Sequence, residues 1–451
     1  MEPGTEQIPD KLLSRISIAK QELEHCSDVR VISHYDADGI SSAGVLCNAL
    51  LRADKRFHAT LIKSLTEEVV AEATKDCEFL ILSDMGSAHL DELERSGCKT
   101  IVLDHHAPLR DSEKIIHINP HLAGIDGMTS ASASAMCMLF AIHLDEENWD
   151  LLPIAFAGIS GDRQAIRGLS GINKWLFEEG TKRGIVKAMP ASLVPSGPLA
   201  DGLCNSIEPY IRGINSNPEG ARGLLEEAGI PVDATSTDID DAQRVRLSSL
   251  LVLRMVEQGV PLSTIEELIH ERYYFPKRKI EAGDLASLLN ACGRSDKEGM
   301  GVALTLGDPE AMAEAQRLRK EYTSEVLAGL DRIAQKGVTQ LENIQYFHND
   351  GMGLSGILCG VTMQYLGDRD KPTIALSPSG DKVKISSRGT FELLDEGIDL
   401  AEALRESAAA VSGTGGGHRI AAGAMVPKER EEDFLNELDC KIGEQKAQKK
   451  V

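Results

Sequence analysis

Four short segments within the first 162 residues carry acidic and imidazole side chains. They contribute His34, Asp36, Asp38, Asp84, Asp104, His105, His106 and Asp162. Carboxylates that meet in one crevice repel each other strongly unless cations neutralise them. A mixed set of oxygen and imidazole ligands suits Mn²⁺ or a similar divalent ion, and the lack of thiolates argues against a structural zinc site. Two such ions, about 3.5–4 Å apart, would clamp the attacking and leaving oxygens of a phosphoryl transfer.

The elements that must position these side chains can be predicted between residue 29 and about residue 195. Short apolar runs alternate there with helical segments, and the runs cover residues 29–33, 79–83, 100–103 and 115–118. Such alternation predicts a parallel, doubly wound α/β sheet. Three of the acidic clusters directly follow predicted strands. Because the carboxyl ends of parallel strands meet in one crevice, we expect these clusters to converge.

Each segment also has a simpler explanation when it is taken alone. Asp36 and Asp84 belong to a residue type that caps helices well. The histidine pair could lie at the surface, and Asp162 could pair with its neighbour Arg163. The joint occurrence of the segments in one α/β domain favours the metal site over these separate explanations.

The whole chain is predicted to be an α/β protein in four parts. An N-terminal domain with the doubly wound sheet (1–195) precedes a mostly helical, proline-rich insertion (196–282), connecting helices (283–335) and a smaller C-terminal α/β domain (336–451). Strand candidates in the last part are 344–347, 373–376 and 383–386. A cleft is expected between the two α/β domains.

Composition limits the function classes that are open. The chain has 451 residues, of which 42% are hydrophobic, so it can bury more than one core. Its net charge of −22 argues against a passive nucleic-acid coat, and its 4% of aromatic residues argues against an extended base-stacking surface. A nuclease stays compatible, because carboxylates hold metals and a basic groove can be local.

Nothing in the sequence predicts export or membrane insertion. The first residues are acidic and lack a basic-then-apolar signal, and no apolar run approaches the roughly 18–20 residues of a membrane span. The nine cysteines occur singly, without a CxxC pair, so we expect them to be reduced. These features predict a cytoplasmic protein without a membrane partner.

The acidic motifs resemble those of the DHH phosphoesterase superfamily. The run from Gly413 to Gly423 resembles the glycine-rich signature of the associated DHHA1 domain, and residues 384–388 resemble its substrate-contacting strand. Residues 285–294 resemble the corresponding stretch of RecJ-type exonucleases, and the match covers nearly the whole chain except about 196–280. The layout is similar to that of archaeal RecJ-like proteins, some of which bind the replication machinery through the GINS complex.

The resemblance implies a role for each residue of the metal site. Two divalent ions, Mn²⁺ in the first place with Mg²⁺ or Co²⁺ as alternatives, would be bound by Asp36, Asp38, Asp84, His105 and Asp162, with His34 as a further candidate. Asp84 would bridge the ions, His106 would steady the scissile phosphate, and Asp104 would orient the histidine pair. A water held between the ions would attack phosphorus in line.

Substrate contacts are expected outside the metal site. The candidates are Ser387, Arg388, Gly415, Gly416, Gly417, His418, Asn290 and Arg294. Closely spaced glycines let backbone N–H groups approach a phosphate, and arginine binds phosphate through two parallel hydrogen bonds. The alternatives are a flexible loop for the glycines, and helix capping or surface pairing for Asn290 and Arg294.

The favoured function is an exonuclease on single-stranded DNA or RNA, with a link to DNA replication or repair. One alternative keeps the chemistry on a smaller phosphodiester, such as an oligoribonucleotide or a cyclic dinucleotide. The other is a replication scaffold that docks GINS. The insertion and the connecting helices favour a polymeric substrate, and the intact motifs favour an enzyme over a scaffold. Polarity, the choice between DNA and RNA, and oligomeric state stay open at this stage.

Overall fold

The computed structural model describes residues 8–350 and 353–448. The chain divides into two compact units, each made of two segments: Met1–Ala191 with Ile269–Tyr322, and Ser192–Leu268 with Thr323–Val451. Helix α14 (Pro309–Lys336) contributes to both units. The units cut across the four parts predicted from the sequence, because the predicted connecting helices are divided between them.

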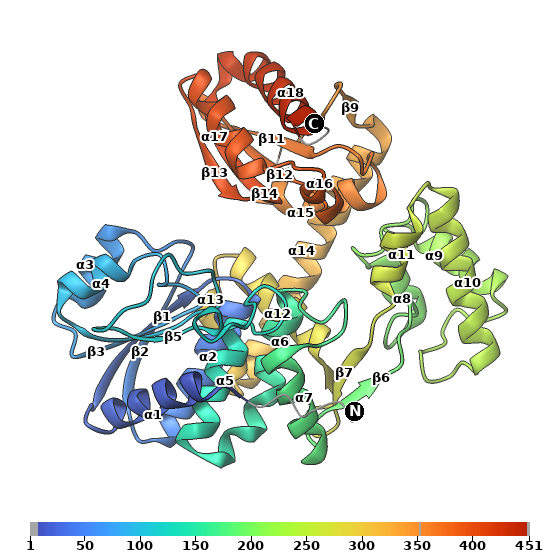
Figure 1. Cartoon of the computed structure of the whole chain (residues 1–451). Coiled ribbons are helices and arrows are strands. Elements are labelled where there is room, and N and C mark those ends of the chain that lie inside the picture. The colour runs from blue at the N-terminus through green and yellow to red at the C-terminus, as the bar shows by residue number, and fades with distance from the viewer. Residues whose placement is uncertain (1–7, 351–352, 449–451) are drawn as a thin grey trace, which may run out of the picture. The chain divides into compact units, whose positions relative to one another are not determined.

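The first unit is built around a five-stranded parallel sheet in the order β2-β1-β3-β4-β5. The strands are β1 (Asp28–His34), β2 (Arg56–Ile62), β3 (Phe79–Ser83), β4 (Lys99–Leu103) and β5 (Ile116–Ile118). The central strand β3 is buried along its whole length, which suits a strand covered on both faces. The sheet lies in the blue part of the chain in Figure 1.

Helices cover both faces of this sheet. The face with Val31 and Ile81 packs against α1 (Asp10–Glu24), α2 (Ala37–Arg52), α5 (Ala133–Leu144) and α6 (Leu152–Gly161). The face with Ile32 and Leu82 packs against α3 (Glu67–Thr74) and α4 (Leu90–Ser96). The predicted doubly wound parallel sheet is therefore confirmed.

The return of the chain at residue 269 completes the first unit. Strands β6 (Lys187–Met189), β7 (Arg272–Phe275) and β8 (Ile280–Glu281) form a small antiparallel sheet beside α7 (Gly171–Lys182). Helices α12 (Ala282–Arg294) and α13 (Glu298–Thr305) share a core with α2 that includes Ile40, Leu289 and Val302. This packing brings residues from two distant parts of the sequence to the start of α2.

The second unit contains the predicted helical middle segment. Its helices are α8 (Leu199–Cys204), α9 (Pro218–Glu227), α10 (Asp241–Glu257) and α11 (Leu262–Leu268). Asp240 starts α10 with a capping box, in which its carboxylate accepts from the Gln243 backbone and the Gln243 side chain accepts from the Asp240 backbone. The predicted mostly helical character of this segment is confirmed.

A six-stranded mixed sheet in the order β13-β14-β12-β11-β10-β9 forms the C-terminal part of the second unit. Its strands are β9 (Thr339–Gln340), β10 (Gln345–His348), β11 (Thr373–Ser379), β12 (Lys382–Arg388), β13 (Thr414–His418) and β14 (Ala421–Pro427). The helices are α15 (Ser355–Tyr365), α16 (Phe391–Asp395), α17 (Leu400–Ala410) and α18 (Glu431–Gln448). Leu404 of α17 and Phe434 of α18 pack against the sheet in one core. The predicted C-terminal α/β domain is confirmed.

The glycine-rich run forms strand β13 at the edge of this sheet and the start of β14, so the flexible-loop alternative is wrong. Strand β13 pairs along its length with β14. A Cβ on Gly415 would lie 2.6 Å from the backbone oxygen of Leu404, so this glycine lets α17 approach the sheet. A Cβ on Gly416 would meet nothing within 4 Å, so packing does not require glycine there.

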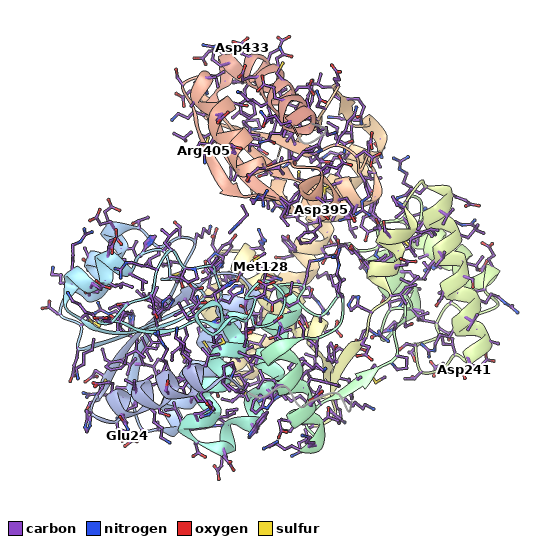
Figure 2. The ribbon with its side chains drawn as sticks, in the orientation of Figure 1. Glu24, Met128, Asp241, Asp395, Arg405 and Asp433 are labelled. Carbon is purple, nitrogen blue, oxygen red and sulfur yellow. The ribbon has the colours of Figure 1, made fainter. Side chains whose placement is uncertain are left out.

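Charged side chains lie on the outside of both units, as Figure 2 shows for Glu24 at the end of α1 and Asp433 in α18. Among residues 8–350 and 353–448, no helix combines the length and the apolar character needed to cross a membrane.

Candidate metal centre

The acidic and imidazole side chains meet at the carboxyl edge of the five-stranded sheet. At the end of β1, His34 Nδ1 lies 2.9 Å from Asp36 Oδ2 and 3.4 Å from Asp84 Oδ2. After β4, His105 Nε2 lies 3.3 Å from Asp84 Oδ1 and 3.4 Å from Asp162 Oδ2. Ligand atoms gather in three overlapping groups: His34, Asp36 and Asp84; Asp38, His105 and Asp162; and Asp84, His105 and His106.

Asp36 and Asp38 are held by different helix N-termini. Asp36 Oδ1 accepts from Gly39 N at 3.1 Å and caps α2, while its Oδ2 faces His34. Asp38 is buried, and its two oxygens accept from the first N–H groups of α5, Ala133 N at 2.8 Å and Ser134 N at 3.1 Å. The capping explanation for Asp36 is therefore correct, and one carboxylate oxygen still faces the cluster.

Asp84 stands in a strained backbone conformation. Its φ of 57° is in the left-handed region, which costs a non-glycine residue on the order of 1 kcal/mol. Its N–H donates to Leu103 O at the end of the neighbouring strand β4 (3.0 Å). The surrounding structure maintains this backbone conformation. The conformation directs the buried Asp84 carboxylate toward both His34 and His105.

Backbone and amide groups orient the ring of His105. Its Nδ1 lies 2.8 Å from Gly127 O, an arrangement in which Nδ1–H donates and Nε2 faces the carboxylates. Gln164 Nε2 donates to the same carbonyl (2.9 Å), and Asn173 Nδ2 donates to Gln164 Oε1 (2.7 Å). No sequence pattern pointed to Gly127, Gln164 or Asn173, because each is a single polar or glycine residue outside any motif.

Asp104 accepts hydrogen bonds from both members of the histidine pair. Its Oδ1 accepts from the backbone N of His105 (2.8 Å) and from Nδ1 of His106 (2.7 Å). Its Oδ2 accepts from the backbone N of Ser87 (3.0 Å). The His106 side chain is 43% exposed, so a ligand from solution can reach its ring.

The electrostatics of the cluster favour a positive charge beside its carboxylates. Burial raises the pKa of Asp38 to about 6. Burial and the Asp38 carboxylate raise the pKa of Asp162. Although burial favours the neutral acid, hydrogen bonds from His105 and His34 lower the pKa of Asp84 to about 2. Hydrogen bonds to carboxylates outweigh burial at His34 and raise its pKa to about 11. An oxygen and imidazole donor set with excess carboxylates fits divalent cations.

Small residues let three helices meet at the site. A Cβ on Gly158 of α6 would overlap Asp38 Oδ1 and Ser134 Oγ. A Cβ on Gly161 would lie 2.7 Å from the Cβ of Ala37. The close approach of α2, α5 and α6 therefore depends on the absence of side-chain atoms at these positions.

Two family models match the chain: the DHH family, N-terminal domain, at residues 28–159, and the DHHA1 domain at residues 344–444. The uncharacterized protein MJ0831 of Methanocaldococcus jannaschii is 32% identical over 439 residues, which are 95% of this chain and 96% of that protein. The chain belongs to the DHH/DHHA1 family.

RecJ and CDC45 proteins are similar to this DHH/DHHA1 chain. Single-stranded-DNA-specific exonuclease RecJ of Dickeya dadantii is 25% identical over 455 residues, covering 95% of this chain and 69% of that protein. RecJ in complex with Mn²⁺ from Thermus thermophilus has a TM-score of 0.61 at 17% identity, and the match covers 98% of this chain and 56% of that one. CDC45 from Entamoeba histolytica has a TM-score of 0.64 at 11% identity, covering 96% and 98%. Family membership supports a metal-dependent phosphoesterase.

Asn290 and Arg294 lie beside the first DHH motif. Asn290 Oδ1 accepts from Ala37 N in the first turn of α2 (3.1 Å), and the Arg294 guanidinium lies 5.8 Å from the centre of the Tyr35 ring. Asn290 thus caps α2 and not the connecting helix on which it lies. A direct substrate contact by either residue stays a prediction.

The substrate candidates of the DHHA1 domain lie on β12 and β13, with β14 between these strands. Ser387 is fully buried, and its hydroxyl donates to Ala422 O (2.9 Å), so this side chain has a structural contact. Arg388 Nη1 donates to Ser387 O (2.8 Å). A Cβ on Gly356, in the first turn of α15, would lie 3.0 Å from Arg388 Nη2. Arg388 therefore lies beside a helix N-terminus, where anions are favoured.

His117 is a buried histidine that belongs to none of the sequence motifs. Its Nε2 lies 2.9 Å from Ser87 Oγ, and Asn119 Nδ2 donates both to this hydroxyl (3.0 Å) and to His106 O (2.9 Å). This network therefore holds the backbone carbonyl of His106, and with it the histidine pair, in place. A histidine inside the apolar run 115–118 was the available signal.

A neutral His117 makes stability dependent on pH. Burial lowers the pKa of His117 from 6.5 to about 4, so the unfolded chain binds more protons between these values. Stability must then fall as pH decreases from above 6.5 toward 4, by up to about 3 kcal/mol from this residue. We expect His117→Asn to lose less unfolding free energy over this range in urea titrations. Equal slopes for the wild type and His117→Asn would contradict this account.

Proposed function

We propose that the chain is a Mn²⁺-dependent exonuclease that shortens single-stranded DNA or RNA from one end. The observation that carries this proposal is the gathering of Asp38, Asp84, His105 and Asp162 within one cluster at the carboxyl edge of the sheet. The similarity to RecJ, described as a single-stranded-DNA-specific exonuclease, supports the choice of substrate.

Two groups of residues would hold the metal ions. His34, Asp36 and Asp84 form one group, and Asp38, His105 and Asp162 form the other. Asp84 directs Oδ2 toward His34 of the first group and Oδ1 toward His105 of the second group, so it could be a ligand shared by the two groups. Bound Mn²⁺, or Mg²⁺ or Co²⁺ in its place, supplies Lewis acidity that activates water and stabilises charge on phosphoryl oxygens.

His106 would hold the scissile phosphate. The hydrogen bond of its Nδ1 to Asp104 outweighs burial and raises the pKa of His106, which favours a charged ring near neutral pH. The half-exposed imidazolium can donate to a phosphate oxygen from Nε2. Asp104 fixes the ring for this contact and is a positioning residue.

The DHHA1 domain would bind the remaining backbone of the substrate. Gly416 leaves open space beside the β13 backbone, and Arg388 stands beside the N-terminus of α15. His418, at the end of β13, is exposed. These features support phosphate contacts by Gly416, Arg388 and His418, and they give the buried Ser387 a supporting role.

End-labelled substrates test this function. DNA and RNA oligomers, each labelled at the 5′ or the 3′ end, are incubated with the protein and Mn²⁺, with EDTA in a parallel reaction and blunt duplexes as the matched substrates. We expect progressive shortening of single strands from one end, resistant duplexes, and no cleavage in EDTA. Cleavage of only the shortest oligomers would replace this proposal by the small-substrate phosphodiesterase. Intact oligomers in all four reactions would contradict both.

A scaffold function has one supporting observation, which is the likeness to CDC45 over nearly both whole chains. An active nuclease that also docks on GINS would join the two functions. Pull-down of purified GINS by the tagged protein tests this docking, with the tagged DHHA1 domain of another protein as the control bait. Absence of GINS from the wild-type bait would remove the docking proposal and leave the nuclease proposal unchanged.

A further inference from the structure

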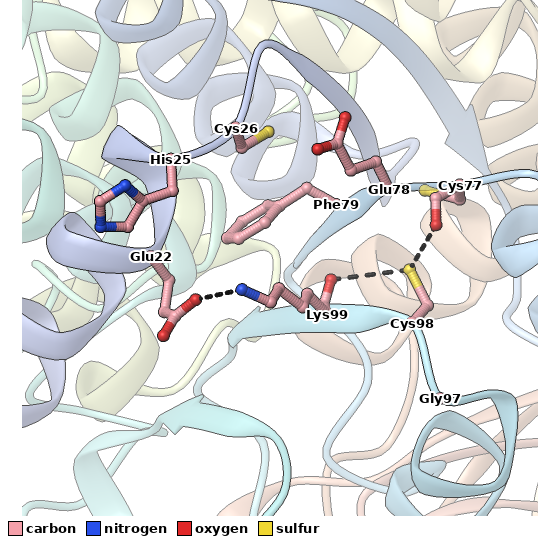
Figure 3. Close-up of a pocket in the computed structure, with 9 residues that line it drawn as sticks. All are labelled: Glu22, His25, Cys26, Cys77, Glu78, Phe79, Gly97, Cys98 and Lys99. Atoms are coloured by element: carbon pink, nitrogen blue, oxygen red, sulfur yellow. Dashed lines mark hydrogen bonds and ion pairs between the residues drawn. The ribbon is translucent and has the colours of Figure 1, made fainter.

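A second group of reactive side chains lies at the other edge of the same sheet. Cys77 stands two residues before β3, and Cys98 directly precedes β4. These strands are parallel neighbours, with Phe79 opposite Lys99, so the two cysteines stand at adjacent strand starts. They line a pocket together with Cys26 and Lys99 (Figure 3).

The Cys98 thiol contacts Cys77, and both cysteines are accessible. Cys98 Sγ donates to Cys77 O at 3.3 Å and to Lys99 O at 3.6 Å. Both residues are half-buried. Figure 3 shows Cys98 directed toward Cys77 at one end of the pocket. The neighbouring Cys26 is buried, and its thiol donates to Asp28 O at 3.1 Å, so it is not available in the same way.

The local charges make the pair unequal. The hydrogen bond from Cys98 and the positive Arg30 guanidinium lower the pKa of Cys77 to about 7, against the effect of burial. The thiol of Cys98 has a raised pKa, because it donates to Cys77 and is partly buried. A thiolate is the nucleophile in disulfide exchange, so Cys77 is the residue suited to attack first.

We propose that Cys77 and Cys98 form a reversible thiol–disulfide modification site that reacts with low-molecular-weight disulfides such as oxidised glutathione. The Cys77 sulfur attacks one sulfur of the small disulfide, a mixed disulfide forms, and one small thiol leaves with the proton from Cys77. The Cys98 sulfur then attacks the Cys77 sulfur, gives up its proton and releases the second small thiol. Two protein thiols are oxidised to one disulfide, while one small disulfide is reduced to two thiols.

The disulfide would close a loop that carries a metal ligand. Residues 77–98 include β3, Asp84 and α4, and the link would join the starts of β3 and β4. Loop closure restricts the unfolded chain, so oxidation should raise the melting temperature. The two cysteines precede the first residues of β3 and β4, whereas Asp84 and Asp104 follow the last residues of these strands. A five-residue strand therefore separates each cysteine from its aspartate by about 17 Å. Metal binding should therefore stay unchanged on oxidation.

Peptide mapping tests the site in the full-length protein. The exposed Cys440 is first replaced (Cys440→Ser), and the reduced protein is incubated with oxidised glutathione. Trypsin cuts after Lys75, Arg95 and Lys99, so the two cysteines fall on separate peptides. We expect one linked peptide pair that has lost two hydrogen atoms, a higher melting temperature, and reversal of both by dithiothreitol. Absence of the linked pair would overturn the proposal without any further variant.

Two matched variants test the order of attack. Without its partner, Cys77 should retain one glutathionyl group in Cys98→Ser. Cys98 should stay largely unmodified in Cys77→Ser. Equal glutathione incorporation in the two variants would contradict the assignment of Cys77 as the attacking residue. These readouts are independent of nuclease activity, so failure of the exonuclease proposal would leave them interpretable.

Discussion

Asp84→Asn is expected to abolish high-affinity Mn²⁺ uptake and phosphodiester cleavage together. Asp84 directs carboxylate oxygens to both His34 and His105, so its loss removes charge from both candidate ligand groups. Loss of a residue that only supports a ligand costs about 10–100-fold in affinity or activity, and loss of a shared ligand should cost more. Isothermal titration calorimetry with Mn²⁺ and the end-labelled oligomer assay measure the two effects.

Stability measurements separate ligand loss from unfolding in this variant. Asparagine tolerates the left-handed backbone of residue 84, but it loses the carboxylate charge that the hydrogen bonds from His34 and His105 stabilise in the folded protein. The metal-free variant should therefore unfold cooperatively, at a melting temperature at or below that of the wild type. The rise in melting temperature that Mn²⁺ gives the wild type should disappear. Asp150→Asn, at a surface ion pair with Arg52, is the control and should behave as the wild type. Wild-type Mn²⁺ affinity in Asp84→Asn would refute the proposed centre.

Gly158→Ala is expected to lower both stability and metal affinity. The added methyl group would overlap Asp38 Oδ1 and Ser134 Oγ, so either α6 or the carboxylate must move. Overpacking of this kind costs about 1–3 kcal/mol, and displacement of Asp38 from the N–H groups of α5 would disturb a candidate ligand. Urea unfolding and Mn²⁺ calorimetry measure the two losses.

Gly223→Ala is the matched control for this substitution. Gly223 lies inside helix α9, is exposed, and a Cβ there would meet nothing within 4 Å. Alanine favours a helix over glycine by about 1 kcal/mol, so the control should be neutral or slightly more stable. If Gly158→Ala is as stable as the control and binds Mn²⁺ with wild-type affinity, the close packing of Gly158 against Asp38 and Ser134 is not required, and this prediction is wrong.

Asp36 and Asn290 show that a sequence pattern can predict where a residue lies but not which groups its side chain contacts. The strand-then-acid pattern placed Asp36 at a strand end, and the structure adds that one of its oxygens caps α2 while the other faces His34. Asn290 was expected to contact substrate or to cap a helix. The packing of α12 on α2 places its side-chain oxygen on Ala37 N, a contact between residues far apart in the sequence.

The sequence alone determined the doubly wound sheet and the strand ends at which the acidic and imidazole residues stand, because strand periodicity and chain order decide which edge of a parallel sheet a residue reaches. Only the tertiary structure decided how these side chains are held. Asp38 is oriented by the start of α5 and His105 by the carbonyl of Gly127. Burial patterns tell which face of an element is covered. They do not tell which distant backbone group covers it, because that depends on how whole helices pack.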